Sequence, residues 1–137
     1  MGRILAIDYG SKRSGIAVTD ESKIIASGLT TVNTKELLTW LQDYCMNEEV
    51  DLIIIGEPKR LHGEHSAIEE EIKIFITQLK NQLQAVEIKR MDERFTSKMA
   101  FDVMLTSGLS KKKRRDKKLV DQISATIILQ DYLHYNM

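Results

Sequence analysis

The sequence predicts an α/β fold in which helices cover both faces of a mixed five-stranded sheet. Two observations predict it. Three short strand-like segments follow one another near the N-terminus, and from residue 33 onward helical periodicities alternate with apolar strand-like runs. Consecutive strands favour an antiparallel meander, whereas alternating helices and strands favour crossover connections. The chain has 137 residues, the size expected of one domain with one core.

The first three strands are marked by apolar runs and by the turn residues between them. Residues 3–8, RILAID, form an apolar run that ends in an acid. A second strand is predicted from residues 16–19, and a third from residues 23–32, which are apolar and β-branched. Gly10 and Gly15 bracket the first turn. Connections this short are typical of an antiparallel meander.

Helices are indicated by capping signals and by apolar stripes. Asn33 and Glu36 form a capping-box pattern at the start of the first helix, and Ser66 and Glu69 form another before the second. The apolar stripe of the first helix contains Leu37, Trp40, Leu41 and Tyr44, and that of the second contains Ile68, Ile72, Phe75, Ile76, Leu79 and Leu83.

The remaining elements complete the sheet and add two C-terminal helices. Residues 51–56, DLIIIG, are nearly all apolar, as in a central strand covered on both faces, and residues 85–91 form a fifth strand. Helices are expected at about 97–107 and 117–134. The order β-β-β-α-β-α-β-α-α is that of the ribonuclease H-like fold, and we expect a single such domain over residues 1–137.

Composition excludes several classes of protein. Hydrophobic residues make up 42% of the chain, which allows a packed core. No apolar run approaches the roughly 20 residues that a membrane span requires, and the N-terminal MGRILAID does not have the pattern of a signal peptide. The single cysteine, Cys45, excludes an internal disulfide. A cytoplasmic protein without membrane association is expected.

The net charge is zero, but the charges are unevenly distributed. Residues 111–118, KKKRRDKK, hold seven basic residues and one acidic residue, a local charge of +6. The other residues must therefore sum to −6. Such a separation of positive from negative charge along the chain is compatible with an enzyme that acts on nucleic acid. A solubilising surface run is the alternative.

Two acids lie in apolar surroundings and need a compensating partner. Asp8 ends the first strand, where a carboxylate requires a cation or hydrogen-bond donors; the alternative is a turn acid that caps the following loop. Asp121 shares a helical face with Ala125, Ile128, Leu129 and Tyr132. An ion pair with a nearby Arg or Lys is the alternative explanation for Asp121.

A third acid is expected at the end of the fifth strand. Asp92 and Glu93 are adjacent, so their side chains point to opposite faces of the strand. Only one of them can therefore point at a given site. Carboxylates gathered from two strand ends and the last helix are suited to bind hard cations such as Mg²⁺. Two such ions stabilise the attacking and leaving oxygens of phosphodiester hydrolysis.

Four segments, in order along the chain, resemble the YqgF (RuvX) family. They are IDYGSKRSGIAVTD at 7–20, IIIGEPKRLHGE at 53–64, DERFTS at 92–97 and KKLVDQISATIILQDYL at 117–133. Members of that family are described as Holliday junction resolvases or as nucleases of pre-16S rRNA. The resemblance implies a ribonuclease H-like nuclease, with Asp8, Glu93 and Asp121 as the catalytic and metal-binding acids and Mg²⁺ or Mn²⁺ as cofactor.

One position departs from the family pattern. The family usually has Gly-Leu-Pro after its fourth strand, whereas this chain has Gly56-Glu57-Pro58. An acid at this point either joins the metal site or faces solvent, and we favour solvent.

Several cations are candidates for contacts with substrate phosphates. Lys12 and Arg13 follow Asp8, and Arg94 follows Glu93. Cations near a metal site hold a scissile phosphate or offset developing charge. Ordinary surface cations are the alternative, more so for Lys12 than for the two arginines. In the basic run, the residues expected to contact the phosphate backbone are Lys112, Lys113, Arg114 and Arg115.

The function expected from these features is metal-dependent hydrolysis of phosphodiester bonds, in the maturation of the 5′ end of 16S rRNA. Resolution of a four-way DNA junction is an alternative within the nuclease class. A non-catalytic RNA-binding assembly factor is an alternative from another class, and the intact set of acids disfavours it. A nucleotide-dependent kinase of the actin type would need two lobes, and this chain supplies one. The protein is expected to be a monomer or a homodimer.

Overall fold

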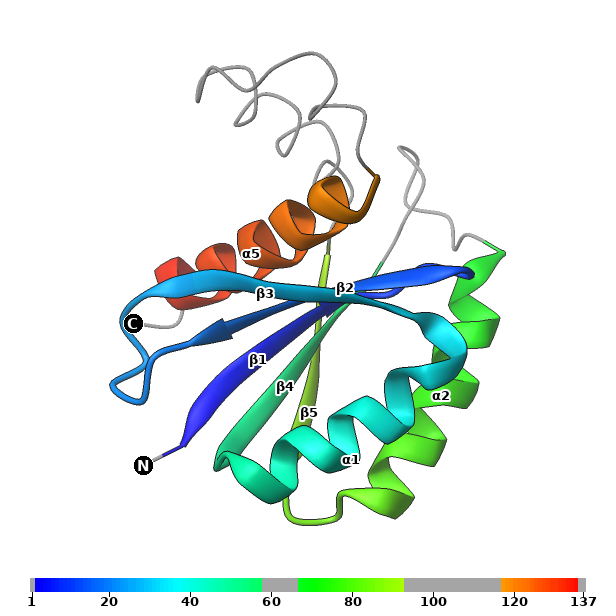
Figure 1. Ribbon diagram of the computed structural model, residues 1–137, viewed down its shortest axis with the longest axis horizontal. Coiled ribbons are helices and arrows are strands. Elements are labelled where there is room, and N and C mark those ends of the chain that lie inside the picture. Colours follow the sequence, from blue (N-terminus) through cyan, green and yellow to red (C-terminus); the bar gives the residue numbers. More distant parts are fainter. Residues whose placement is uncertain (1, 58–66, 93–116, 136–137) are drawn as a thin grey trace.

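The computed structural model describes residues 2–57, 67–92 and 117–135. These residues form five strands and the helices that cover them (Figure 1). The elements are β1 (Arg3–Asp8), β2 (Arg13–Thr19), β3 (Ala26–Asn33), the 3₁₀ turn η1 (Thr34–Glu36), α1 (Leu37–Asn47), β4 (Val50–Glu57), α2 (Ile68–Gln82), β5 (Glu87–Asp92) and α5 (Lys117–Tyr135).

The sheet is mixed, as predicted. Its strand order is β3-β2-β1-β4-β5. The pairs β1–β2 and β2–β3 are antiparallel, whereas β1–β4 and β4–β5 are parallel. Because β1, β4 and β5 run in the same direction, their carboxyl ends, at Asp8, Glu57 and Asp92, lie along one edge of the sheet.

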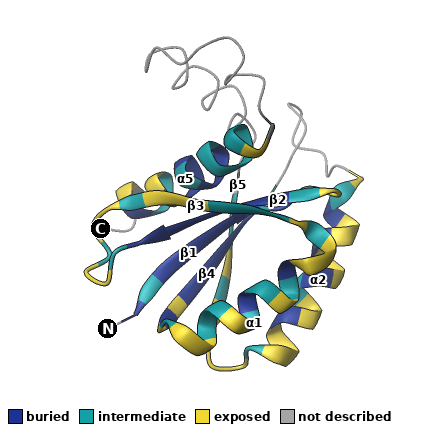
Figure 2. Ribbon diagram, viewed as in Figure 1, coloured by how far each residue is buried: buried dark blue, intermediate teal, exposed yellow. Residues whose placement is uncertain are grey.

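Each face of the sheet has its own apolar core, because side chains of β1 alternate between the two faces. Leu5 and Ile7 pack with α1 and α2, on what we call the α1/α2 face. Ile4 and Ala6 pack with α5, on the α5 face. Figure 2 shows the buried residues concentrated in the central strands and on the sides of the helices that meet the sheet.

Helix α5 approaches β2 closely enough to require a glycine. A Cβ atom on Gly15 would lie 2.0 Å from the backbone oxygen of Asp121, well inside van der Waals contact. At Gly28 of β3 the approach is looser, since a Cβ there would lie 3.3 Å from Oγ1 of Thr126. The absence of a side chain at Gly15 therefore lets the N-terminal half of α5 rest on the sheet beside the end of β1.

The third strand begins later than predicted. Lys23, expected to open the strand, instead has a φ of 60° in a turn, and Asp20 accepts hydrogen bonds from the backbone N–H groups of Ile24 and Ile25 at 2.8 and 2.9 Å. These hydrogen bonds, that from Ile25 first, lower the pKa of Asp20. The strand starts at Ala26 because a side-chain-capped turn satisfies the backbone of the preceding residues.

The capping box predicted at Asn33 is wrong. Asn33 is extended and its side chain makes no capping hydrogen bond, and the 3₁₀ turn η1 precedes α1. The predicted box at the start of α2 lies partly outside the described residues, because Ser66 is among those not described. Its other member, Glu69, is buried and binds Arg90 instead. Within the described residues, no helix is both long enough and apolar enough to cross a membrane.

Candidate active site

Asp8 lies at the carboxyl end of β1, on the α5 face. The alternation along β1 puts it on the same side as Ile4 and Ala6, which pack against α5. Its partner across the antiparallel pair is Gly15. Asp8 is partly exposed, so a carboxylate here can reach solvent and a substrate.

Asp121 reaches the same place from the helix. Its backbone packs directly on Gly15, which is the strand partner of Asp8. The next residues on its helical face, Ala125, Ile128 and Leu129, are buried against the sheet, as the periodicity predicted. Two acidic residues far apart in the sequence therefore lie at the same end and on the same face of the sheet.

Asp121 is paired with a cation. Nε of Arg13 lies 3.6 Å from Oδ2 of Asp121, and the two side chains are 29% and 26% exposed. Asp121 is therefore at the margin of the core and not inside it, and the ion pair considered from the sequence is present. The separation is too long for a hydrogen bond, and among the described residues the buried Nε of Arg13 has no hydrogen-bond partner. A cation held this close offsets the charge of the carboxylates and can also reach an anionic ligand.

The loop between β1 and β2 is fixed by hydrogen bonds to η1. The Thr34 hydroxyl donates to the Gly10 carbonyl, and the Thr34 N–H donates to the Lys12 carbonyl at 2.9 Å. The buried Ser14 hydroxyl contacts Thr34 at 2.9 Å and accepts from the Gly10 N–H at 3.4 Å. This network holds the loop that carries Lys12 and leads from Asp8 to Arg13, the first residue of β2.

Glu57 ends β4 on the opposite face. Ile53 and Ile55 of the same strand belong to the core of the α1/α2 face, and the alternation puts Glu57 with them. Its Oε2 lies 4.0 Å from Nη1 of Arg90. Glu57 is thus directed away from the face that holds Asp8 and Asp121.

Arg90 joins three elements through a buried ion pair that the sequence reasoning missed. Its guanidinium donates to both carboxylate oxygens of Glu69 at 2.7 and 2.9 Å, and to the carbonyls of Ile55 and Gly56 at 3.2 and 3.0 Å. The Glu69 side chain is 1% exposed. One signal could have revealed this pair: Glu69 stands three and seven residues before Ile72 and Ile76, on the apolar face of α2.

We predict that Arg90→Met lowers the free energy of unfolding by about 3–5 kcal/mol, because the buried Glu69 carboxylate is left without its cation. Urea denaturation measures the change. The double variant Arg90→Met/Glu69→Leu should recover most of the loss. Lys73→Met is the matched control, since the Lys73–Glu70 pair is 3.9 Å long and 53% and 79% exposed. A loss in the control equal to that of Arg90→Met would contradict the prediction.

A second prediction concerns Glu57→Leu, which restores the usual family residue. Arg90 keeps Glu69 and two carbonyls as partners, so cleavage should stay within a few-fold of wild type and stability within about 0.5 kcal/mol. Single-turnover cleavage and urea denaturation test both. A drop of about a hundredfold at equal stability would place Glu57 in the metal site, since losses of that size follow damage to metal coordination.

The other candidate residues lie outside the described residues. They are Glu93, Arg94, Lys112, Lys113, Arg114 and Arg115. The predicted helix at 97–107 lies outside them as well. Among the described residues, no group of three or more His, Cys, Asp or Glu side chains is placed to hold a metal ion. The described part of the chain thus brings together two of the three expected acids, Asp8 and Asp121.

The donor chemistry of this pair fits a hard cation. Both side chains offer carboxylate oxygens, the ligands preferred by Mg²⁺ and Mn²⁺. Among the described residues, Cys45 packs on the α1/α2 face and His134 lies in the last turn of α5, far along the helix from Asp121. Partial exposure of both acids also leaves room for water and a phosphate among the ligands.

Comparisons with known proteins give the family. The family model described as "RuvX: Holliday junction resolvase" matches residues 2–135. A protein of Flavobacterium psychrophilum named "Putative pre-16S rRNA nuclease" is 57% identical over 97% of both chains. One of the same name from Bacteroides fragilis is 53% identical over 97% of this chain and 96% of its own.

Solved structures support the fold. The chain resembles "T. thermophilus RuvC in complex with Holliday junction substrate", with a TM-score of 0.55 and 14% identity over 98% of this chain and 96% of that one. At this identity the likeness concerns the fold, which is ribonuclease H-like as the element order predicted. The nuclease class expected from the sequence is confirmed by the family match, and the chain belongs to the RuvX family.

Proposed function

We propose that this nuclease depends on a divalent cation, Mg²⁺ or Mn²⁺, which is held by Asp8, Asp121 and Glu93. One observation carries the proposal: Asp8 and Asp121 lie at the same end and on the same face of the sheet, joined through the contact at Gly15. Neighbouring carboxylates repel one another unless positive charge lies among them. Arg13 supplies part of that charge beside Asp121, and a divalent cation would supply the rest. The bound cation would generate the attacking hydroxide and stabilise the leaving oxygen.

The protein's own residues would hold the acids in place and bind the substrate phosphates. Asp8 and Asp121 approach from a strand and a helix that are each packed into the core, which keeps both carboxylates in place. Arg13 places a positive charge beside Asp121 and is suited to bind a non-bridging phosphate oxygen. Lys12, exposed on the anchored loop, is suited to hold a neighbouring phosphate.

We propose the 5′ end of pre-16S rRNA as substrate, cut in the cytoplasm by this single domain. The names of the relatives from Flavobacterium psychrophilum and Bacteroides fragilis support RNA. The description of the family supports a four-way DNA junction as the second candidate. Either substrate is a polyanion, and the run at 111–118, which has a charge of +6, is suited to bind its backbone.

One assay separates these candidates. Purified protein is incubated with labelled pre-16S RNA and with a synthetic four-way DNA junction, each with Mg²⁺, with Mn²⁺ or with EDTA. The proposal expects metal-dependent cleavage of the RNA at the mature 5′ end. Cleavage of the junction alone would show that the substrate is a DNA junction and not the RNA. Equal cleavage in EDTA would show that the reaction needs no metal ion.

A further inference from the structure

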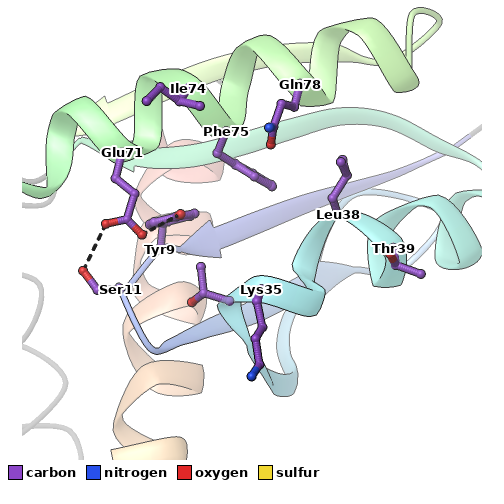
Figure 3. A pocket seen from close by; sticks show the side chains of 10 residues that line it. Tyr9, Ser11, Lys35, Leu38, Thr39, Glu71, Ile74, Phe75 and Gln78 are labelled. Atoms are coloured by element: carbon purple, nitrogen blue, oxygen red, sulfur yellow. Dashed lines mark hydrogen bonds between the residues drawn. The ribbon is translucent and has the colours of Figure 1, made fainter.

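A hollow of about 380 Å³ opens on the α1/α2 face, at the loop that follows β1, between α2 on one side and η1 and α1 on the other (Figure 3). Tyr9 and Phe75 lie at its base, with ring centroids 5.3 Å apart. Leu38 from α1 and Gln78 from α2 extend toward the space between the two helices. Leu38, Ile74 and Phe75 give the hollow apolar surface, and the rest of its lining is polar or charged. A concave space of this size is typical of a small-ligand site.

The hollow is connected to the loop that follows Asp8. Tyr9 is the next residue after Asp8 and points to the α1/α2 face, where it belongs to the core with Leu5 and Ile7. A second hollow of about 350 Å³ adjoins the first, because both are lined by Ser11 and Lys35, and it includes Lys12. The two hollows therefore lie along the loop that joins Asp8 to β2, on the face of the sheet opposite Asp121.

The polar group at the end of the hollow is a carboxylate acceptor. Glu71 accepts hydrogen bonds from the Tyr9 hydroxyl at 3.0 Å and from the Ser11 hydroxyl at 3.3 Å, one on each oxygen. Burial, together with the hydrogen bond to Glu71, raises the pKa of Tyr9 to about 12, so Tyr9 remains a donor at neutral pH. A carboxylate has about four acceptor sites, so Glu71 can accept two further hydrogen bonds from a ligand.

The end of the hollow that is formed by Glu71 favours a base over a phosphate. A carboxylate repels a phosphate group but accepts hydrogen bonds from the N–H groups of a base. Ile74 lines the same hollow and is 63% exposed, which provides apolar surface for the face of a ring. Lys35, which lines both hollows, and Lys12, which lines the second, are exposed and suited to a phosphate at the boundary between them.

We propose that this hollow is a subsite for one unpaired nucleobase of the substrate strand, and that guanine fits it best. Guanine presents two adjacent donors, N1–H and N2–H, to the two oxygens of Glu71, while the flanking phosphate is held by Lys12 and Lys35. The inference rests on the proposed function because it assigns the substrate as single-stranded nucleic acid beside the cut.

Binding in EDTA tests the subsite without requiring cleavage. Fluorescent oligouridine RNAs carrying one central guanosine, adenosine, cytidine or uridine are titrated with the full chain, and anisotropy reports the affinity. Wild type should prefer guanosine by about tenfold or more, the discrimination that a bidentate base contact provides. Glu71→Gln should lose most of this preference, because an amide offers one acceptor and one donor.

Two further variants guard against indirect effects. Glu70→Gln is the matched control, since Glu70 is on the same turn of α2 but pairs with Lys73 on the surface, and it should keep the preference. Gln78→Trp fills the hollow from an exposed position without altering Glu71, and it should remove the preference. Melting temperatures of all variants check the fold.

The outcomes separate this inference from the proposed function. Guanosine-selective binding that Glu71→Gln and Gln78→Trp abolish supports the subsite even if no RNA is cleaved. Metal-dependent cleavage by a protein that binds all four RNAs equally overturns the subsite and leaves the proposed function intact. Retention of the preference in both variants overturns it too, as does guanosine monophosphate alone binding as tightly as the RNA, because the hollow would then be a free-nucleotide pocket.

Discussion

Asp8→Asn is expected to slow cleavage by about a thousandfold or more, because a catalytic metal supplies several kcal/mol of transition-state stabilisation and each 1.36 kcal/mol is tenfold in rate. Asparagine keeps the shape of the side chain and removes its charge. Single-turnover cleavage of saturating RNA with Mg²⁺ measures the effect on chemistry separately from binding.

The stability of the same variant distinguishes a ligand from a structural acid. Removing one of two neighbouring carboxylates relieves repulsion, so the melting temperature in metal-free buffer should be unchanged or higher. Asp43→Asn, on the exposed side of α1, is the matched control and should leave both cleavage and stability unchanged. If Asp8→Asn cut as fast as wild type, Asp8 would be a turn acid only.

Gly15→Ala is expected to have the second largest effect. The added Cβ would lie 2.0 Å from the Asp121 backbone oxygen, so α5 must move away from β2. Overpacking of this kind destabilises by about 1–3 kcal/mol, and a shift of about 1 Å in a catalytic group can cost about a hundredfold in rate. Urea denaturation and single-turnover cleavage measure the two effects.

Gly28→Ala is the natural comparison for this variant, because it probes the same helix from the neighbouring strand. Its Cβ would meet Oγ1 of Thr126 at 3.3 Å, which a small adjustment can accommodate. We expect a change in stability within about 1 kcal/mol and nearly normal cleavage. Equal effects at the two glycines would show that the close contact of Gly15 with Asp121 matters no more for stability and cleavage than the looser contact of Gly28 with Thr126.

Local patterns predicted the elements whose residues carry a strong period. The apolar run before Asp8, the DLIIIG strand and the apolar face of α2 were all located from the sequence, because burial imposes a period of two or about 3.6 residues. Asp8 was selected because it ends an apolar strand, and Asp121 because it shares a helical face with apolar residues. The structure then adds what brings them together, which is the contact of Gly15 with α5.

Features that depend on long-range packing were not predictable in the same way. Arg13 pairs with Asp121 across 108 positions of the chain, and Arg90 pairs with Glu69 across two elements. The error at Asn33 has a similar cause. The hydroxyl of Thr34 binds the Gly10 carbonyl in the loop after β1, and this tertiary contact, invisible in the local motif, accompanies a 3₁₀ turn where a capped helix was expected.

The central claim is that Asp8 and Asp121 hold a shared divalent cation, and Mn²⁺ binding tests it most directly. Electron paramagnetic resonance of free Mn²⁺ gives the affinity of wild type, Asp8→Asn, Asp121→Asn and the control Asp43→Asn, without substrate. The account predicts that wild type and Asp43→Asn bind alike and that each of the other two binds at least about tenfold more weakly, since even indirect damage to coordination has that effect. Equal Mn²⁺ affinity in all four proteins would contradict it.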